Sequence, residues 1–386
     1  MITPRFRLRQ DANFIYIVVE LPYVKISEVE VDVESAQFTM YVKPYFLKLT
    51  FGHDLRDDEQ SKGVYDIERK EITFKVSKAQ PGTEFEDLDL VASLLSPKKP
   101  RDRGFIEVVS GQEDQEEGGM PSDRCYGFNR RFQHFFEQQQ EAQYELLDFD
   151  PDVYPVPARA QVALEREQED FELDRYLTDL DEEAITQTLS SPTEELYRAL
   201  LPSIEEQMSA LQLDAAVRLG SRELLVSTAM LPCLFHQCFD VLFAFCYEFR
   251  SMEGELTCES AWGINKLSAT LSCMLEFPDL PTVLTSCFRR ALVYPLYRSE
   301  ALAQAALNDA RRLVADGKGA MLRALLAVKH AFERSEPRYL LNRLFIDDAS
   351  VWVQRVETGH FRAFQTAVGG LQCPSLEELG LSFTVQ

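Results

Sequence analysis

The residues that could carry catalysis are few in this sequence and stand apart from one another. Gly317-Lys318-Gly319 is too short to cradle a phosphate, and we interpret it as a turn between two helices. His236 lies between Cys233 and Cys238, a spacing that could suit a metal ion or a thiol nucleophile, but its apolar segment favours a packed core histidine. We therefore expect no catalytic, cofactor-binding or metal-binding residue, and we expect that the protein is not an enzyme.

Carboxylates are the one reactive group that the sequence gathers in a single window. Residues 137–183 hold sixteen acidic and three basic side chains. Rows of carboxylates could stand in for phosphates in front of a surface rich in lysine and arginine, or they could simply form the solvated face of an acidic helix. The candidate acids are Glu165, Glu169, Asp170, Asp174, Asp179, Glu182 and Glu183, in a run that also contains Glu167, Glu172 and Asp181.

Aromatic and arginine side chains could anchor a partner beside these acids. Tyr176 is interleaved with them, at a spacing that equally suits the inner face of a helix. Trp262, Tyr297 and Arg298 could belong to an interface or to a buried, hydrogen-bonded corner. We keep all four as candidate partner-binding residues.

The overall charge limits the classes of partner. The chain of 386 residues has a formal net charge of −23, which repels phosphate backbones and anionic membranes and attracts basic surfaces. We expect a monomer that binds neither nucleic acid nor membrane directly. The first residues lack the apolar run of a secretory signal, and the most apolar stretch, residues 224–239, is interpreted as a buried helix. Eight cysteines without a Cys-x-x-Cys pair indicate reduced thiols.

Two domains must position these residues. Residues 1–96 alternate between apolar and polar side chains in segments 5–9, 13–20, 28–33, 37–43, 45–51, 63–67 and 71–76, a pattern that predicts a seven-stranded antiparallel β-sandwich. The phase of the alternation slips at Pro44, where we expect a bulge or bend on an edge strand.

A charged segment and a helical region follow. Residues 97–124 are predicted to be a flexible linker, in which residues 98–103 could be a nuclear-import signal or only a solvated charge run. Residues 125–386 have helical periodicity, with Ser299 as the cap of a helix over residues 300–315 and Gly317 beyond its end. Residues 241–245 and 292–297 have no polar face and are predicted to lie inside an all-helical domain.

Several segments resemble one known family. Residues 20–23, ELPY, and residues 41–49, YVKPYFLKL, are similar to the CS domain, a sandwich shared by small heat-shock proteins and co-chaperones, although their aromatic side chains could merely fill a core. Residues 125–128, CYGF, 259–268, ESAWGINKLS, and 289–298, RRALVYPLYR, resemble the Shq-specific helical domain of H/ACA ribonucleoprotein assembly chaperones.

The resemblance implies a function. Members of this family bind a dyskerin-type pseudouridine synthase on its RNA-binding surface, as an acidic mimic of RNA, until guide RNA is loaded. The particles assembled in this way serve rRNA pseudouridylation, ribosome biogenesis and the telomerase ribonucleoprotein. The resemblance further implies that the protein is located in the nucleoplasm and cytoplasm, and that an AAA+ or heat-shock chaperone complex releases it from the synthase. The alternative is a co-chaperone or adaptor whose CS-like sandwich docks on an ATP-driven heat-shock chaperone.

The domain division leads to a first prediction. Residues 1–96, expressed alone, should fold as an all-β domain, because their strands form a continuous run that ends at a charged segment. Far-ultraviolet circular dichroism and thermal unfolding of this fragment check the prediction. A mainly helical spectrum, or unfolding without cooperativity, would contradict it.

Overall fold

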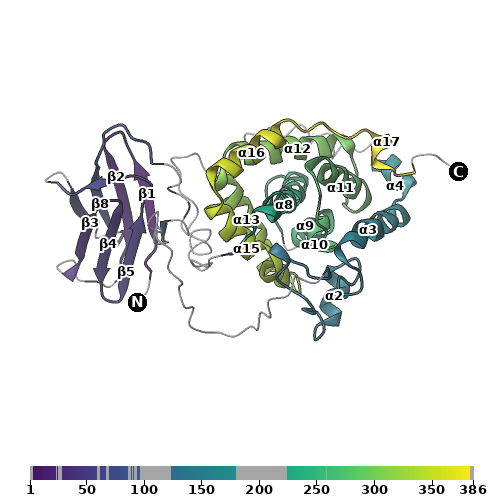
Figure 1. Cartoon of the computed structure of the whole chain (residues 1–386), viewed down its shortest axis with the longest axis horizontal. Coiled ribbons are helices and arrows are strands. Elements are labelled where there is room, and N and C mark those ends of the chain that lie inside the picture. The colour runs from purple at the N-terminus through teal and green to yellow at the C-terminus, as the bar shows by residue number, and fades with distance from the viewer. Residues whose placement is uncertain are drawn as a thin grey trace. The chain divides into compact units, whose positions relative to one another are not determined.

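The structure, a computed structural model, divides into two compact units, one of strands and one of helices (Figure 1). It describes residues 3–22, 24, 28–58, 61–66, 69–85, 88, 90, 94–95, 123–179, 224–257 and 259–382. The predicted linker therefore lies outside the described residues up to residue 122, as do candidate residues Glu182 and Glu183. The domain boundaries placed at residues 96 and 125 stay predictions.

The first unit consists of antiparallel strands in two sheets. One sheet has the order β1-β2-β8-β6, with β7 also paired to β8, and the other has the order β3-β4-β5. The strands are β1 (Phe6–Gln10), β2 (Phe14–Glu20), β3 (Glu30–Glu34), β4 (Gln37–Val42), β5 (Tyr45–Thr50), β6 (Leu55–Arg56), β7 (Lys62–Asp66) and β8 (Glu71–Lys78).

Alternation of side chains places the core of this unit between its sheets. Ile15, Ile17 and Val19 of β2 are fully buried, as are Phe38 and Met40 of β4. The ring of Phe38 lies 5.4 Å from that of Phe74 on β8, so the two sheets pack face to face. The predicted β-sandwich is confirmed, with β6 as a two-residue strand that the sequence pattern did not indicate.

Pro44 corrects one detail of the sequence interpretation. Val42 pairs with Tyr45, so Lys43 and Pro44 form the two-residue turn of a hairpin between β4 and β5, not a bulge within a strand. A hairpin turn reverses the chain, and the side-chain alternation starts afresh in the second strand. The slip of phase at Pro44 marks this reversal.

The second unit is helical. Its helices are η2 (Phe128–Arg130), α2 (Gln140–Leu146), α3 (Val156–Asp170), α4 (Leu173–Asp179), η3 (Thr228–Met230), α8 (Leu231–Ser251), α9 (Ser260–Leu267), α10 (Ala269–Ser272), α11 (Leu280–Val293), α12 (Glu300–Ala315), α13 (Lys318–Glu333), α14 (Tyr339–Leu341), η4 (Asn342–Ile346), α15 (Asp347–Arg355), α16 (Thr358–Gly369) and α17 (Leu376–Leu379). The all-helical prediction is confirmed.

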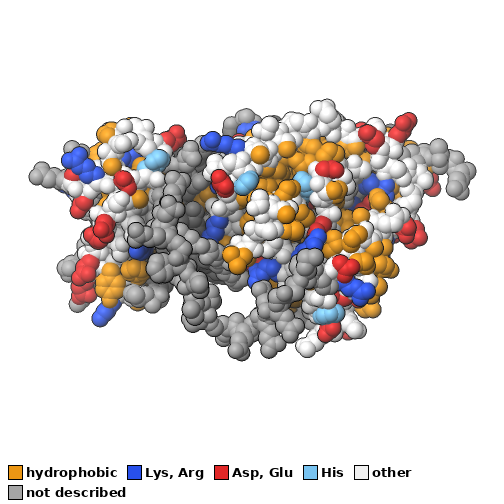
Figure 2. Space-filling model, viewed as in Figure 1, with side chains coloured by type: hydrophobic (Ala, Val, Ile, Leu, Met, Phe, Trp, Pro, Cys, Tyr) orange, Lys and Arg blue, Asp and Glu red, His pale blue; other side chains and the backbone are white. Residues whose placement is uncertain are grey.

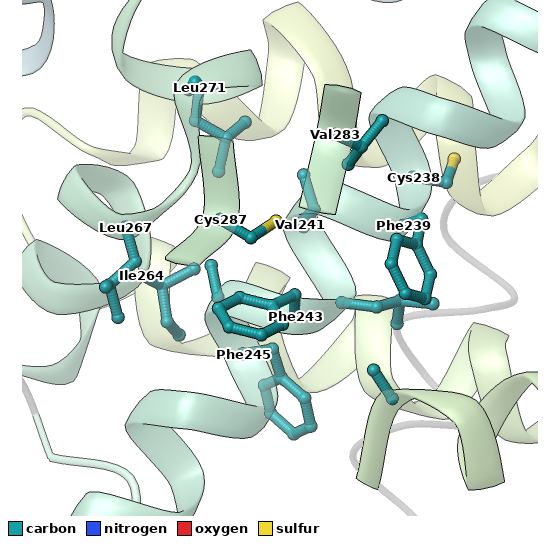
Figure 3. Packing of buried hydrophobic residues seen from close by; sticks show 14 of the residues in the cluster. Cys238, Phe239, Val241, Phe243, Phe245, Ile264, Leu267, Leu271, Val283 and Cys287 are labelled. Carbon is teal, nitrogen blue, oxygen red and sulfur yellow. The ribbon is translucent and has the colours of Figure 1, made fainter. Parts of the chain in front are cut away.

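Helix α8 runs through the middle of this unit, and α9, α11, α12 and α13 surround it (Figure 1). Phe243 and Phe245 of α8 are fully buried and pack among side chains of α9 and α11, such as Ile264 and Cys287 (Figure 3). The segment Thr228–Ser251 is long and apolar enough to cross a membrane, but 72% of its most apolar window is buried inside the unit. Residues 231–239 of the predicted buried helix lie in this core helix, whereas residues 224–230 precede α8 and Leu225 is 87% exposed.

The CYGF segment closes the unit by packing against its C-terminal half. Gly127 has a φ of +77°, and a Cβ added there would meet the carbonyl oxygen of Leu344 at 2.7 Å. The ring of Phe128 lies 5.7 Å from that of Trp352, and Arg131 pairs with Asp348 at 2.5 Å. Only glycine fits this close approach with a positive φ.

Two helix predictions have different outcomes. The Ser299 hydroxyl accepts a hydrogen bond from the Leu302 amide and caps α12, which spans the predicted residues, and Gly317 lies past its end. Residues 292–297 do not all lie inside, because α11 ends at Val293 and Leu296 is 76% exposed in the following connection. An apolar run that contains a chain turn cannot bury every side chain.

A largely buried carboxyl group on α8 generates a second prediction. Burial against α9 raises the pKa of Glu248 to about 7, although a hydrogen bond with Ser260 opposes the rise. Gly263 makes room for this carboxyl group, since a Cβ there would lie 2.1 Å from Glu248 Oε2. Between pH 4.5 and 7 the folded protein therefore holds more protons than the unfolded chain, and this group lowers stability as pH rises.

Glu248→Gln should remove that pH dependence. At pH 8 we expect the variant to be more stable than the wild type by up to about 3 kcal/mol, at roughly 1.4 kcal/mol per pKa unit, with the difference shrinking towards pH 5. Tryptophan fluorescence during urea unfolding measures this, because both tryptophans, Trp262 and Trp352, belong to the helical unit. Glu255→Gln, at an exposed position, is the matched control. Equal stability curves for the wild type and Glu248→Gln would contradict the prediction.

Candidate partner-binding surface

The first half of the acidic window forms α3, and polar residues fasten this helix to the unit. Arg159, Ala163 and Glu167 recur every four residues and are the buried positions of α3. The guanidinium group of Arg159 is fully buried and donates only to carbonyl oxygens among the described residues. These oxygens belong to Arg124, Cys125, Pro151, Tyr154 and Met274.

Glu167 anchors the other end of α3 through two arginines of α11. Its carboxylate lies 2.8 Å from Arg289 Nε and 3.0 Å from Arg290 Nη1, and Glu167 is 2% exposed. The sequence placed Glu167 within the row of partner-facing acids. The structure instead turns it inward, because two buried guanidinium groups need a carboxylate beside them.

Asp148 completes this buried network from the connection between α2 and α3. It lies 2.9 Å from Arg290 Nη2 and 2.5 Å from Lys266 Nζ of α9. Burial alone would raise the pKa of Asp148, but the charges of Arg290 and Lys266 outweigh it and hold the pKa well below its usual range. Arg290 also donates to Ser272 Oγ at 2.8 Å, so the network joins α3, α9, α10 and α11.

The outward residues of α3 and α4 include four of the predicted acids. Glu165, Glu169, Asp170 and Asp174 are all exposed. Asp170 accepts a hydrogen bond from the Tyr294 hydroxyl at 3.1 Å, and Glu165 accepts one from Gln161 at 2.8 Å. Among the described residues, Glu169 and Asp174 have no ion-pair partner. We call these four side chains the carboxylate surface.

Asp179 and Arg298, both candidate residues, are brought together at the end of α4. The Asp179 carboxylate accepts hydrogen bonds from the Arg298 backbone amide at 3.0 Å and from Nη1 at 3.2 Å, and both side chains are largely buried. The neighbouring carbonyl of Tyr297 accepts a bond from the Tyr247 hydroxyl at 2.7 Å. These contacts tie α4 to the connection between α11 and α12.

The remaining candidates lie elsewhere. Tyr176 is 6% exposed and packs against Phe171, whose ring centroid is 6.3 Å away. Trp262 lies on α9 and is 43% exposed. Glu182 and Glu183 fall outside the described residues. The role of each candidate in partner binding stays a prediction.

Sequence reasoning missed the network that holds α3 in place. The signal available was the pair Arg289 and Arg290 inside the apolar segment CFRRALV, which requires buried carboxylates. It also missed Leu164, which is 43% exposed on α3, whereas Leu177, 45% exposed on α4, belongs to the apolar residues that the sequence shows among the acids. Figure 2 shows acidic side chains interspersed with apolar ones at the end of the unit that carries α3, α4 and α17.

The described part of the chain contains no group of three histidine, cysteine or acidic side chains placed to hold a metal ion. His236 is buried, with Nδ1 2.9 Å from the Phe277 carbonyl oxygen, in agreement with a packed core histidine. Gly317 lies in the turn between α12 and α13 as predicted, but Lys318 and Gly319 already belong to the first turn of α13.

Comparison with known proteins gives two family matches. The family model described as SHQ1-like, CS domain, matches residues 3–95, and the one described as SHQ1 protein, Shq1 domain, matches residues 205–381. Protein SHQ1 homolog of Xenopus tropicalis is 33% identical over 98% of this chain and 68% of that protein. The Mus musculus homolog is 32% identical over 99% of this chain and 75% of its own length. Protein shq1 of Schizosaccharomyces pombe is 28% identical over 92% of this chain and 89% of its own length.

The buried network leads to a third prediction. Glu167→Gln should destabilise the helical unit by about 3 kcal/mol, because it leaves two buried arginines short of a carboxylate. Glu165→Gln, two residues away on the exposed face, should change stability by less than about 0.5 kcal/mol. Urea unfolding followed by tryptophan fluorescence compares them. Equal stability of the two variants would show that the buried network does not anchor α3.

Proposed function

The chain belongs to the SHQ1 family of chaperones, and on this premise we propose that it is an assembly chaperone of box H/ACA ribonucleoproteins. It binds a dyskerin-type pseudouridine synthase on the surface that guide RNA will later occupy. An AAA+ or heat-shock chaperone complex then removes it when RNA is loaded. This activity belongs to the nucleoplasm and the cytoplasm.

The observation that carries the proposal is the carboxylate surface on its fixed support. Glu165 and Glu169 are four residues apart on α3, so they lie on one face of the helix. Asp170 ends α3 and Asp174 lies in the first turn of α4, so the four exposed acids come from two consecutive helices. An RNA-binding surface is rich in lysine and arginine, and a row of carboxylates offers it the negative charge that phosphates would offer.

Rigidity makes this surface effective. Buried Arg159 and Glu167 hold α3 at both ends, and the Asp179 and Arg298 pair holds the end of α4. A binding surface whose backbone is already ordered loses less conformational entropy when its partner arrives. Exposed Leu164 and Leu177 add apolar area beside the charges.

Reversal of the carboxylate surface generates a fourth prediction. The variant with Glu165, Glu169, Asp170 and Asp174 replaced by lysine should associate with the synthase at least about tenfold more slowly at low salt, with a smaller change in dissociation, because exposed charges act mainly on encounter. The effect should shrink at about 0.15 M salt, where the Debye length is roughly 8 Å. Stopped-flow measurements on the purified synthase give both rates.

A matched variant separates position from total charge. Glu253, Glu255, Glu333 and Glu357 are exposed acids on other parts of the helical unit, and their replacement by lysine changes the net charge equally. We expect this control to keep most of the association rate, and guide RNA to compete with the wild-type protein for the synthase. Equal slowing by both variants, or simultaneous binding of RNA and protein, would refute RNA mimicry.

A further inference from the structure

The two outer faces of the β-sandwich differ in charge, because one is acidic and the other has a basic corner. On β3, Glu30, Asp32 and Glu34 pair with Tyr41, Thr39 and Gln37 of β4, on the side of the sheet away from the core. Figure 2 shows acidic side chains on the side of the sandwich where Figure 1 places β3. The outer face of the other sheet carries a row of lysine and arginine side chains, although the chain as a whole is strongly acidic.

Register places three cations in one row across that other sheet. Arg9 of β1 pairs with Tyr16 of β2, Tyr16 pairs with Lys75 of β8, and Lys75 pairs with Lys62 of β7. Ile15 and Ile17 flank Tyr16 and point into the core, so the row lies on the outer face. Four strands at about 4.8 Å spacing give the row a length of roughly 14 Å. We call these four residues the cation row.

Apolar side chains lie beside the cation row. Val18 and Val64 belong to the next row of the same face, and Val64 is 66% exposed. On the other side, the Lys75 ammonium group lies 3.6 Å from the centre of the Phe14 ring. Arg9 and Lys62 are exposed, and among the described residues neither has an ion-pair partner.

Carboxylates limit the basic area to one corner of the face. Asp11 accepts a hydrogen bond from the Tyr16 hydroxyl at 2.8 Å. Glu71 pairs with Arg7, and Glu20 and Asp66 continue the same row on β2 and β7. The cation row therefore matches a few negative charges and not a long polyanion.

We propose that the cation row binds a short acidic segment of a partner protein. Two or three carboxylates of this segment would contact the cations, and one apolar residue would contact Val18 and Val64. Carboxylates on alternate residues of an extended segment are about 6.8 Å apart, which lies between the roughly 4.8 Å separation of neighbouring strands and the roughly 9.6 Å separation of next-neighbouring strands, so long lysine and arginine side chains can reach them. This site lies on the sandwich and is independent of the function proposed for the helical unit.

An acidic peptide fits this face better than RNA does. Single-stranded nucleic acid needs open aromatic faces for base stacking, whereas the Phe14 ring is covered by Lys75 and the Tyr16 hydroxyl is held by Asp11. The net charge of −23 further repels a polyanion that extends beyond the cation row. A short peptide avoids most of that repulsion.

The fifth prediction tests this site with the full chain. A fluorescein-labelled peptide of alternating glutamate and valine should bind the wild type in fluorescence anisotropy at low salt. R9E/K62E should raise its dissociation constant about tenfold or more, and R9Q/K62Q by a smaller factor, because reversal adds repulsion to the lost attraction. Lys43 and Lys48 are exposed near the opposite face, so K43E/K48E is the control of equal charge and should leave binding unchanged.

Each other outcome overturns the proposal. These are a wild type that does not bind the peptide, equal weakening by R9E/K62E and K43E/K48E, or tighter binding of single-stranded oligouridylate that R9E/K62E abolishes. Circular dichroism must show an intact sandwich in every variant. R9Q/K62Q keeps the test valid if charge reversal disturbs folding.

Discussion

The helical unit depends on two arginines that lie where water cannot reach them. Arg289 and Arg290 lie near the C-terminal end of α11, an apolar helix packed against the core, and a buried charge without a partner costs several kcal/mol. Glu167 and Asp148 supply the carboxylates, from parts of the chain more than 120 residues earlier. Since the distances and directions of these bonds are fixed, α3 has one position against α11. The placement of every outward side chain on α3 follows from this pairing.

One acidic helix thus contains carboxylates with two different tasks. Glu167 neutralises guanidinium groups inside the unit, whereas Glu165 and Glu169 remain in water with their charge available to a partner. Because α3 has little apolar area of its own with which to pack against the unit, it depends on Glu167 for a fixed position. That fixed position holds Glu165 and Glu169 on a rigid surface. Ala163 is its one buried apolar side chain. Stability and binding therefore rest on the same short sequence without competing for the same residues.

The sequence was sufficient where a local pattern decides the structure. Strict alternation identified β3 and β8, the Ser299 cap and Gly317 bounded α12, and the lack of a polar face placed α8 in the core. It was insufficient where a distant residue decides. Helical spacing puts Arg159 and Glu167 on one face of α3, but only the position of Arg290 shows that this polar face points inward. For the same reason a slip of phase at Pro44 could not distinguish a bulge from a hairpin, and the apolar run at residues 292–297 did not reveal that Leu296 is exposed.

The central position of α8 has a consequence for synthesis of the protein. Its partners α9, α11, α12 and α13 all follow it in the chain, and the closing contact of Arg131 joins a residue made 217 positions later. Until those segments leave the ribosome, the nascent chain exposes a 21-residue helix with the length and composition of a membrane span. Apolar segments that wait for distant partners are the ones that aggregate or recruit general chaperones during translation. We therefore expect the helical unit to need protection from aggregation while it is being made.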